Sequence, residues 1–135
     1  MFLSGFISNI HWLPVLVVTI LSFFIGFVWH SPALFGKAWT AENNANKEQL
    51  KSKAPLIFGG TAVLHVIALA GLSAVVSGMG ATMGLLGGLA ISVVWILPAL
   101  GGTYLFAGRS LRLLAIDAGM YIVLFSLSGL ILGIW

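Results

Sequence analysis

The sequence predicts an all-α integral membrane protein, a bundle of four transmembrane helices whose two termini lie on the extracytoplasmic side. The chain has 135 residues, of which 60% are hydrophobic and 7% are charged, whereas soluble domains have roughly 45–50% and about 25%. The sequence contains four apolar runs that are long enough to cross a bilayer core, which takes about 20 helical residues. This composition excludes a soluble enzyme, a nucleic-acid-binding module and a disordered chain. The absence of cysteine excludes disulfides and thiolate metal sites.

The four runs form a single predicted transmembrane domain, residues 1–135. The spans are expected at about residues 10–29, 54–76, 81–107 and 113–135, with a long polar connection at 31–53. The runs are continuous rather than alternating, which excludes a transmembrane β-barrel. The second half of the polar connection, AENNANKEQLKSK, has no apolar periodicity. We therefore expect a solvated loop there, with at most a short helical turn from Lys47 to Lys51.

The orientation follows from the basic side chains, which all lie in the first and third connections. In a four-span protein these two connections share one side of the membrane, and the positive-inside rule assigns that side to the cytoplasm. Both termini are then extracytoplasmic. The basic residues are Lys37, Lys47, Lys51 and Lys53 in the first connection, and Arg109 and Arg112 in the third.

Small residues recur every four positions on the third span, at Gly80, Gly84, Gly88 and Ser92. Such a stripe lets two helix backbones approach closely. The first interpretation is packing within one four-helix bundle, and the second is a homodimer through this span. Further along the span, Pro98 cannot donate a helical hydrogen bond, so a kink is expected there.

Ionisable side chains inside a span are candidates for function, because burying them in lipid is costly unless they are paired or hydrated. At a rise of 1.5 Å per residue, Asp117 lies about 8 Å and His65 about 16 Å from the cytoplasmic end of their spans. Asp117 is expected to face inward, with a partner among His30, Tyr121, Arg112 or bound water. The candidate ligand- or proton-binding residues are Asp117, His65, His30, Tyr121, Thr61, Thr19 and Trp95, of which Thr19, His65, Trp95 and Tyr121 share the expected midplane layer.

Each of these polar residues also has a purely structural interpretation. For His65 this is a hydrogen bond to Tyr121 or Thr19, and for Asp117 it is a pairing near the interface. The difference in depth between Asp117 and either His65 or His30 argues against one shared metal, so no metal site is expected. The cofactor stays unknown at this point.

A compact motif follows the first span: Trp29-His30-Ser31-Pro32, then Phe35-Gly36-Lys37 and Trp39. It resembles the signature of a bacterial membrane family, the domain of unknown function 1761, in which Tyr usually stands at the place of His30. The likeness continues through Trp95, the segment 116–121 and the segment 132–135. The resemblance implies a small four-helix protein of the bacterial inner membrane, and no established activity comes with it.

Mechanically, the Ser31-Pro32 pair is expected to end the first helix. Trp29, Phe35 and Trp39 are expected to anchor the chain at the level of the headgroups, with Lys37 reaching the phosphates. The alternative is a lid whose Lys37 faces Asp117 or an anionic ligand.

Three functions remain open from the sequence. The leading one is a protein that binds or transports a small molecule or ion through a polar cavity open to the cytoplasm. The second is a membrane enzyme or a carrier of haem or quinone that uses His30 and His65, and the third is an accessory subunit without chemistry. A non-enzymatic role is favoured, because no nucleophile-and-base motif is present. The expected partners are the lipid bilayer, a small ligand or ion and a second copy of the chain, with no nucleic acid.

Overall fold

The structure is a computed structural model that describes residues 2–44 and 46–135, apart from the side chain of Lys47. Four of its helices are long and apolar enough to cross a membrane, which confirms the predicted all-α membrane fold. The third spanning helix consists of three consecutive segments, two α-helices joined without a break by a π-helical turn, η1. The spanning elements are α2 (Trp12–Trp29), α5 (Ala54–Val76), α6 (Ala81–Ile91) with η1 (Ser92–Ile96) and α7 (Leu97–Phe106), and α8 (Leu111–Ile134).

Short helices flank the spans: α1 (Phe2–Ser8), α3 (Gly36–Asn43) and α4 (Lys47–Ser52). Helix α4 occupies the position of the expected helical turn, and the Asn46 side chain caps it by accepting hydrogen bonds from the backbone N–H groups of Glu48 and Gln49. Helix α3 was not expected. It is only eight residues long, and helices of this length are marginal on their own, so its contacts with the spans must stabilise it.

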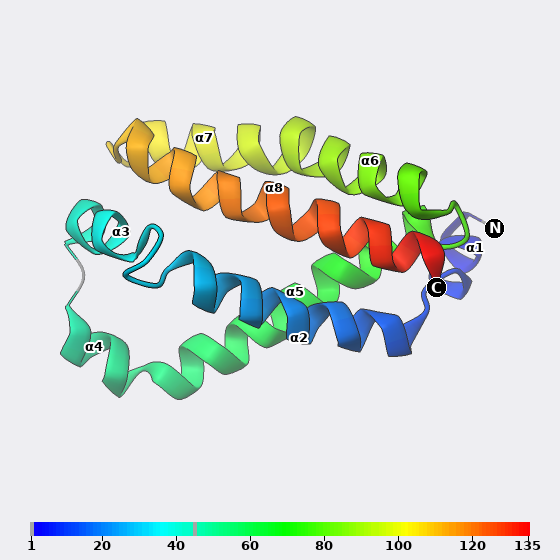
Figure 1. Ribbon diagram of the computed structural model, residues 1–135, viewed down its shortest axis with the longest axis horizontal. Coiled ribbons are helices and arrows are strands. Elements are labelled where there is room, and N and C mark those ends of the chain that lie inside the picture. The colour runs from blue at the N-terminus through cyan, green and yellow to red at the C-terminus, as the bar shows by residue number, and fades with distance from the viewer. Residues whose placement is uncertain (1, 45) are drawn as a thin grey trace.

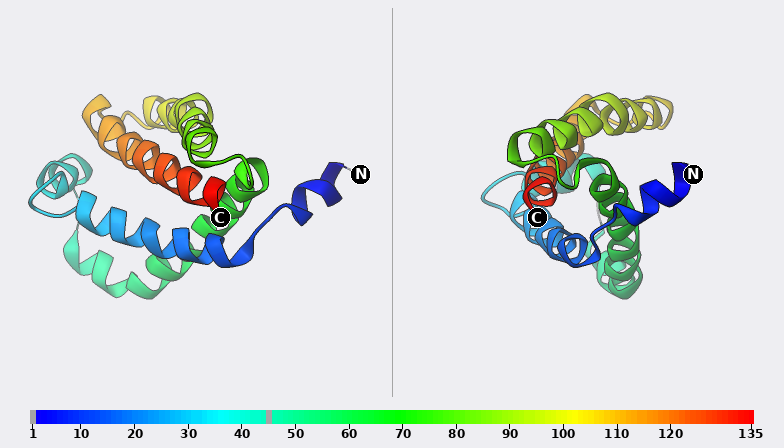
Figure 2. Two further views of the ribbon diagram at one scale, coloured as in Figure 1. Left: turned by 45° about the vertical axis from the view of Figure 1, so that its right-hand side comes forward. Right: turned by 90° about the vertical axis from the view of Figure 1, so that its right-hand side faces the viewer.

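The spans run up and down, and Figure 1 shows both termini at one end of the bundle, beside the turn between α5 and α6. The opposite end carries α3, α4 and the turn between α7 and α8. Helix α1 extends away from the bundle (Figure 2). All the basic side chains that the structure describes therefore lie at the α3 end, or within the turn beside it.

Helices α6 and α8 make the most extensive contact in the bundle. A Cβ atom added to Gly84 would overlap the backbone carbonyl of Gly129, and one added to Gly88 would overlap that of Phe125. The backbones thus touch without side chains between them, as in small-xxx-small packing. Close Cα–H···O contacts of this kind recur at helix–helix interfaces.

The ends of the small-residue stripe are engaged in the same way. The Gly80 N–H donates to the Gly133 carbonyl at 3.0 Å, and Ser92 is fully buried. The structure therefore places the stripe against α8 of the same chain. This contact corresponds to the first interpretation of the stripe, packing within one bundle.

The π-helical turn η1 precedes Pro98, where the sequence predicts a kink. Proline has no N–H to donate to the carbonyl of Val94. In the structure the Leu97 N–H instead donates to the Ser92 carbonyl, five residues back. The wider turn continues the helix past the missing bond and changes the direction in which the following side chains point.

The core lies where α2, α5 and α8 meet. Aliphatic side chains from all three helices pack together there, with Met120 and Phe125 from α8. This arrangement places the polar residues of α2, α5 and α8 on facing surfaces. The fully buried aliphatic residues of this core include Val15, Val18, Leu69, Leu72, Val76, Leu124 and Leu132.

Candidate functional site

The turn after α2 is built by backbone hydrogen bonds. The Phe35 N–H donates to the Trp29 carbonyl at 3.1 Å, and the Gly36 N–H donates to the Ser31 carbonyl at 3.0 Å. A Cβ atom at Gly36 would overlap the His30 carbonyl, so only glycine fits this crossing. The turn reverses the chain and starts α3 at a fixed position over the end of the bundle.

Trp29 attaches this turn to α8. Its indole N–H donates to the Ile116 carbonyl at 2.9 Å, and its ring packs on Phe35 with centroids 4.7 Å apart. The absence of a side chain at Gly119 leaves room for the indole, because a Cβ there would lie 3.1 Å from the ring. This contact joins two parts of the chain that resemble the family signature, the turn after α2 and the segment 116–121.

Asp117 lies beneath α3. The Trp39 indole N–H donates to its Oδ1 atom at 3.1 Å, and the Tyr104 hydroxyl donates to its Oδ2 atom. Trp39 comes from α3 and Tyr104 from α7, so three elements hold this carboxylate. The His30 ring packs edge-on against Trp39, with centroids 5.3 Å apart.

Glu42 holds α3 in place from its other end. Its carboxylate accepts a hydrogen bond from the Ser110 hydroxyl at 2.6 Å and forms an ion pair with Arg112 at 3.9 Å. Ser110 also caps α8 by accepting from the Leu113 N–H at 3.0 Å. Helix α3 is therefore fastened to the start of α8 at both of its turns, over Asp117.

The partners of Asp117 correct the expectation from sequence. His30 instead bonds its own helix, with Nδ1 2.9 Å from the Gly26 carbonyl, and Arg112 faces Glu42. Lys37, the residue proposed for a lid, is exposed. The α3 residue that bonds the carboxylate is Trp39, and no hydrogen bond or ion pair joins Lys37 to Asp117 among the described residues.

The electrostatics of this site are unusual for a membrane protein. Within the described residues, the two groups that bond the Asp117 carboxylate are neutral donors, and no ion pair with it forms. The nearby Arg109 guanidinium lies over the face of the Tyr104 ring, 5.3 Å from its centroid, as in a cation–π contact. Both side-chain oxygens of Asp117 are thus held by neutral hydrogen-bond donors.

A second polar group lies deeper in the bundle. The Nδ1 atom of His65 lies 2.8 Å from the Ser22 hydroxyl oxygen. The sequence predicted Thr19 or Tyr121 as the hydrogen-bond partner of His65, and the structure gives Ser22 instead. The Tyr121 ring does contact the imidazole edge-on, with centroids 6.3 Å apart. Thr19 is buried and donates to the Val15 carbonyl.

The remaining predicted site residues lie elsewhere. Trp95 is 65% exposed and faces outward, because its depth in the span was predicted but not its direction, and η1 alters that direction. Thr61 is half-buried on α5, and no hydrogen bond of its hydroxyl forms within the described residues. Tyr104 was missed altogether. The short α7–α8 hairpin could have revealed it, since such a hairpin places the end of α7 beside the first turns of α8.

The structure does not bring His30 and His65 together. Nδ1 of His30 bonds the Gly26 carbonyl, and Nδ1 of His65 bonds the Ser22 hydroxyl on the same helix, α2. His30 lies about 12 Å beyond Ser22 along α2, so the two imidazoles are at different depths. A haem held between these two imidazoles does not fit this arrangement. In the described part of the chain, no three His, Cys, Asp or Glu side chains gather as metal ligands would.

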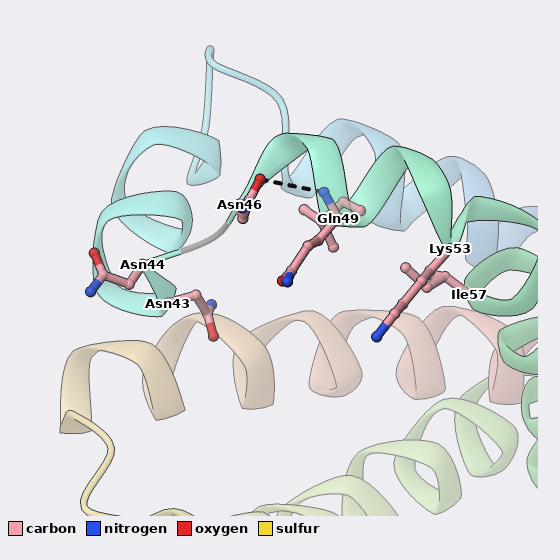
Figure 3. Close-up of a pocket in the computed structure, with 7 residues that line it drawn as sticks. Asn43, Asn44, Asn46, Gln49, Lys53 and Ile57 are labelled. Carbon is pink, nitrogen blue, oxygen red and sulfur yellow. Dashed lines mark hydrogen bonds between the residues drawn. The ribbon is translucent and has the colours of Figure 1, made fainter.

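Two cavities accompany these groups, and Asp117 lines neither of them. One is a polar cleft of about 310 Å³ between the end of α3 and α4, which Figure 3 shows with its amide side chains. Part of this polarity is already used, because Asn46 caps α4 and the Asn43 side chain donates to the Trp39 carbonyl. The other is an apolar groove of about 250 Å³ that includes His65 and Tyr121.

The comparisons with known proteins agree with the resemblance seen in the sequence. The sequence model of one family, described as "Protein of unknown function (DUF1761)", matches residues 13–133. This range includes all four spanning helices, the turn after α2 and Asp117. Neither the curated proteins nor the solved structures give a match.

Proposed function

The chain belongs to the DUF1761 family of membrane proteins, and for it we propose a role in binding a small cation at Asp117 and exchanging it with the cytoplasm beneath α3. The smallest such cation is a proton. In this proposal the half-buried, hydrogen-bonded carboxylate takes the place of the polar cavity open to the cytoplasm that the sequence suggested.

The observation that carries the proposal is the pair of neutral donors on Asp117. A carboxylate in weakly polar surroundings is stabilised most by a positive charge. Trp39 and Tyr104 orient the two carboxylate oxygens without carrying charge, and the Arg109 guanidinium lies on the Tyr104 ring and forms no ion pair with Asp117 among the described residues. The site is therefore electrostatically suited to a cation that arrives from outside the protein.

Charge distribution gives the direction of access. The α3 end of the bundle carries the described basic side chains, and the positive-inside rule assigns such an end to the cytoplasm. With this orientation both termini are extracytoplasmic. The family resemblance favours the inner membrane of a bacterium as the location.

Helix α3 acts as the cover in this proposal. Its side-chain contacts with the spans include the hydrogen bond from Trp39 to Asp117, the packing of Trp39 against the His30 ring and the contacts of Glu42 with Ser110 and Arg112. Exposed ion pairs contribute little to stability, about 0–1 kcal/mol. A cover held by one indole and one glutamate can be displaced without unfolding the bundle.

The test is an infrared titration of the purified protein in lipid vesicles. The carbonyl-stretch band of a protonated carboxyl group is followed as pH and then salt are varied. We expect a band that disappears in Asp117→Asn and that responds to added monovalent cations.

Glu48→Gln is the matched control, because Glu48 is an exposed acid on α4. This variant should leave the band unchanged. A cation-sensitive band that persists in Asp117→Asn, or a band of Asp117 that no cation affects and no pH change titrates, would contradict the proposal.

A further inference from the structure

The apolar groove of about 250 Å³ lies between α5 and the η1–α7 segment, with α8 as its floor. Figure 2 shows α5 and α7 diverging from each other. The groove is larger than a cavity of about 150 Å³ that can hold benzene, so a substituted ring fits it. Its lining residues are Leu64, His65, Ala68, Leu69, Ile96, Leu100, Tyr121, Leu124 and Phe125.

His65 contributes a hydrogen-bond acceptor to this lining. The Ser22 hydroxyl donates its hydrogen to the Thr19 carbonyl at 2.5 Å, so the 2.8 Å contact between Ser22 and the imidazole is a hydrogen bond from Nδ1–H to the Ser22 oxygen. We assign the Nδ1–H tautomer to His65 on this basis. Its Nε2 atom then carries a lone pair, and no hydrogen bond to it forms within the described residues.

Tyr121 contributes a donor. Its ring is held between His65 and Phe125, with edge-on contacts on both sides. Across the described part of the chain, its hydroxyl has no hydrogen-bond partner. A polar group without a partner in apolar surroundings is costly. The groove thus presents one acceptor and one donor within an otherwise apolar lining.

The groove is accessible from the bilayer. Leu64, at its edge, is 67% exposed, and exposed side chains on a spanning helix face lipid. On the other edge, Ile96 belongs to the π-helical turn η1, and π-helical turns occur frequently at functional sites. A ligand reaches this groove sideways from the membrane, without passing Asp117 or α3.

We propose that this groove binds an apolar ring that carries a hydroxyl group, a phenol or quinol dissolved in the bilayer. The ligand hydroxyl donates to Nε2 of His65 and accepts from the Tyr121 hydroxyl. The apolar remainder of the ring packs on the aliphatic side chains of α5 and α7. The inference does not depend on cation binding at Asp117.

The test is photolabelling of the full chain in lipid vesicles with an alkylphenol that carries a diazirine, followed by mass spectrometry of the labelled peptides. The competitors are 4-hexylphenol and its methyl ether, 4-hexylanisole, which cannot donate a hydrogen bond. We expect labelling in the segments 64–69 and 121–125, and competition by the phenol about fivefold better than by the ether.

Two variants and a control complete the design. Ala68→Phe places a ring in the groove from an exposed position, so it should remove labelling while the protein stays folded. The control is Ala90→Phe, the same change at an exposed position of α6 outside the groove, which should leave labelling unchanged. Tyr121→Phe removes a donor from which the oxygen of either compound can accept, so it should weaken competition by both compounds and leave the preference for phenol over ether in place. Labelling that survives in Ala68→Phe, or equal competition by the two compounds, would overturn the proposal.

Discussion

The close contact of α6 with α8 makes a quantitative prediction for Gly84→Ala. An added Cβ atom would overlap the Gly129 carbonyl and lie 3.0 Å from the Gly133 Cα atom, both of them backbone. Backbone atoms cannot rotate away as a side chain can, so the two helices must separate. Overpacking of this kind costs about 1–3 kcal/mol.

A glycine-to-alanine change in a helix also has an intrinsic effect of the opposite sign. Alanine is favoured over glycine by about 0.5–1 kcal/mol. Gly102→Ala isolates this effect, because Gly102 lies in α7 with nothing within 4 Å of an added Cβ atom. We therefore expect Gly84→Ala to lose about 1–2 kcal/mol net and Gly102→Ala to gain slightly.

The assay is reversible unfolding in mixed micelles, with the oligomeric state followed by crosslinking. Equal stability of the two variants would refute the packing argument. A loss of self-association in Gly84→Ala, without loss of stability of the monomer, would instead mean that the stripe joins two copies of the chain.

Three further predictions concern single side chains. Asp117→Leu should keep the four spans assembled but lower the stability by about 1–3 kcal/mol, because the Trp39 and Tyr104 donors lose their acceptor, and it should lose the response to cations. Ser128→Ala should be neutral or stabilising in the same unfolding assay, since the buried Ser128 hydroxyl has no hydrogen-bond partner among the described residues. Ser22→Ala, in contrast, should cost about 1–2 kcal/mol by removing the acceptor of an imidazole N–H. Because the chain has no cysteine, Ser8→Cys and Ser52→Cys can be labelled singly in intact cells, and an impermeant reagent should reach only Ser8→Cys.

The spans were predictable because lipid imposes length and hydropathy on each helix independently of its neighbours. Helix α3 was not, because it is short and its contacts, Trp39 on Asp117 and Glu42 on Ser110, come from residues far away in the sequence. Its sequence also has no apolar periodicity that would predict a helix.

The site was predictable in part. Their position inside the spans identified Asp117 and His65 as candidate polar residues, but depth along a helix does not fix how neighbouring helices rotate against each other. The actual partners, Tyr104 and Ser22, depend on that rotation. The expectation that Trp95 joins the inward polar layer was wrong for a related reason, because the π-helical turn η1 interrupts the regular 3.6-residue period in that span.

The turn after α2 also bears on the order in which the protein folds. The α6–α8 contact joins consecutive spans, and its pair Gly84–Gly129 lies 45 residues apart, whereas the bond from Trp29 to Ile116 closes 87 residues. Contacts of large sequence separation form late, because the entropy of loop closure must be overcome first. We therefore expect the turn after α2 to dock on α8 after α6 and α8 have paired. Loss of the hydrogen bond from Trp29 should then slow this last step of assembly more than the insertion of any helix.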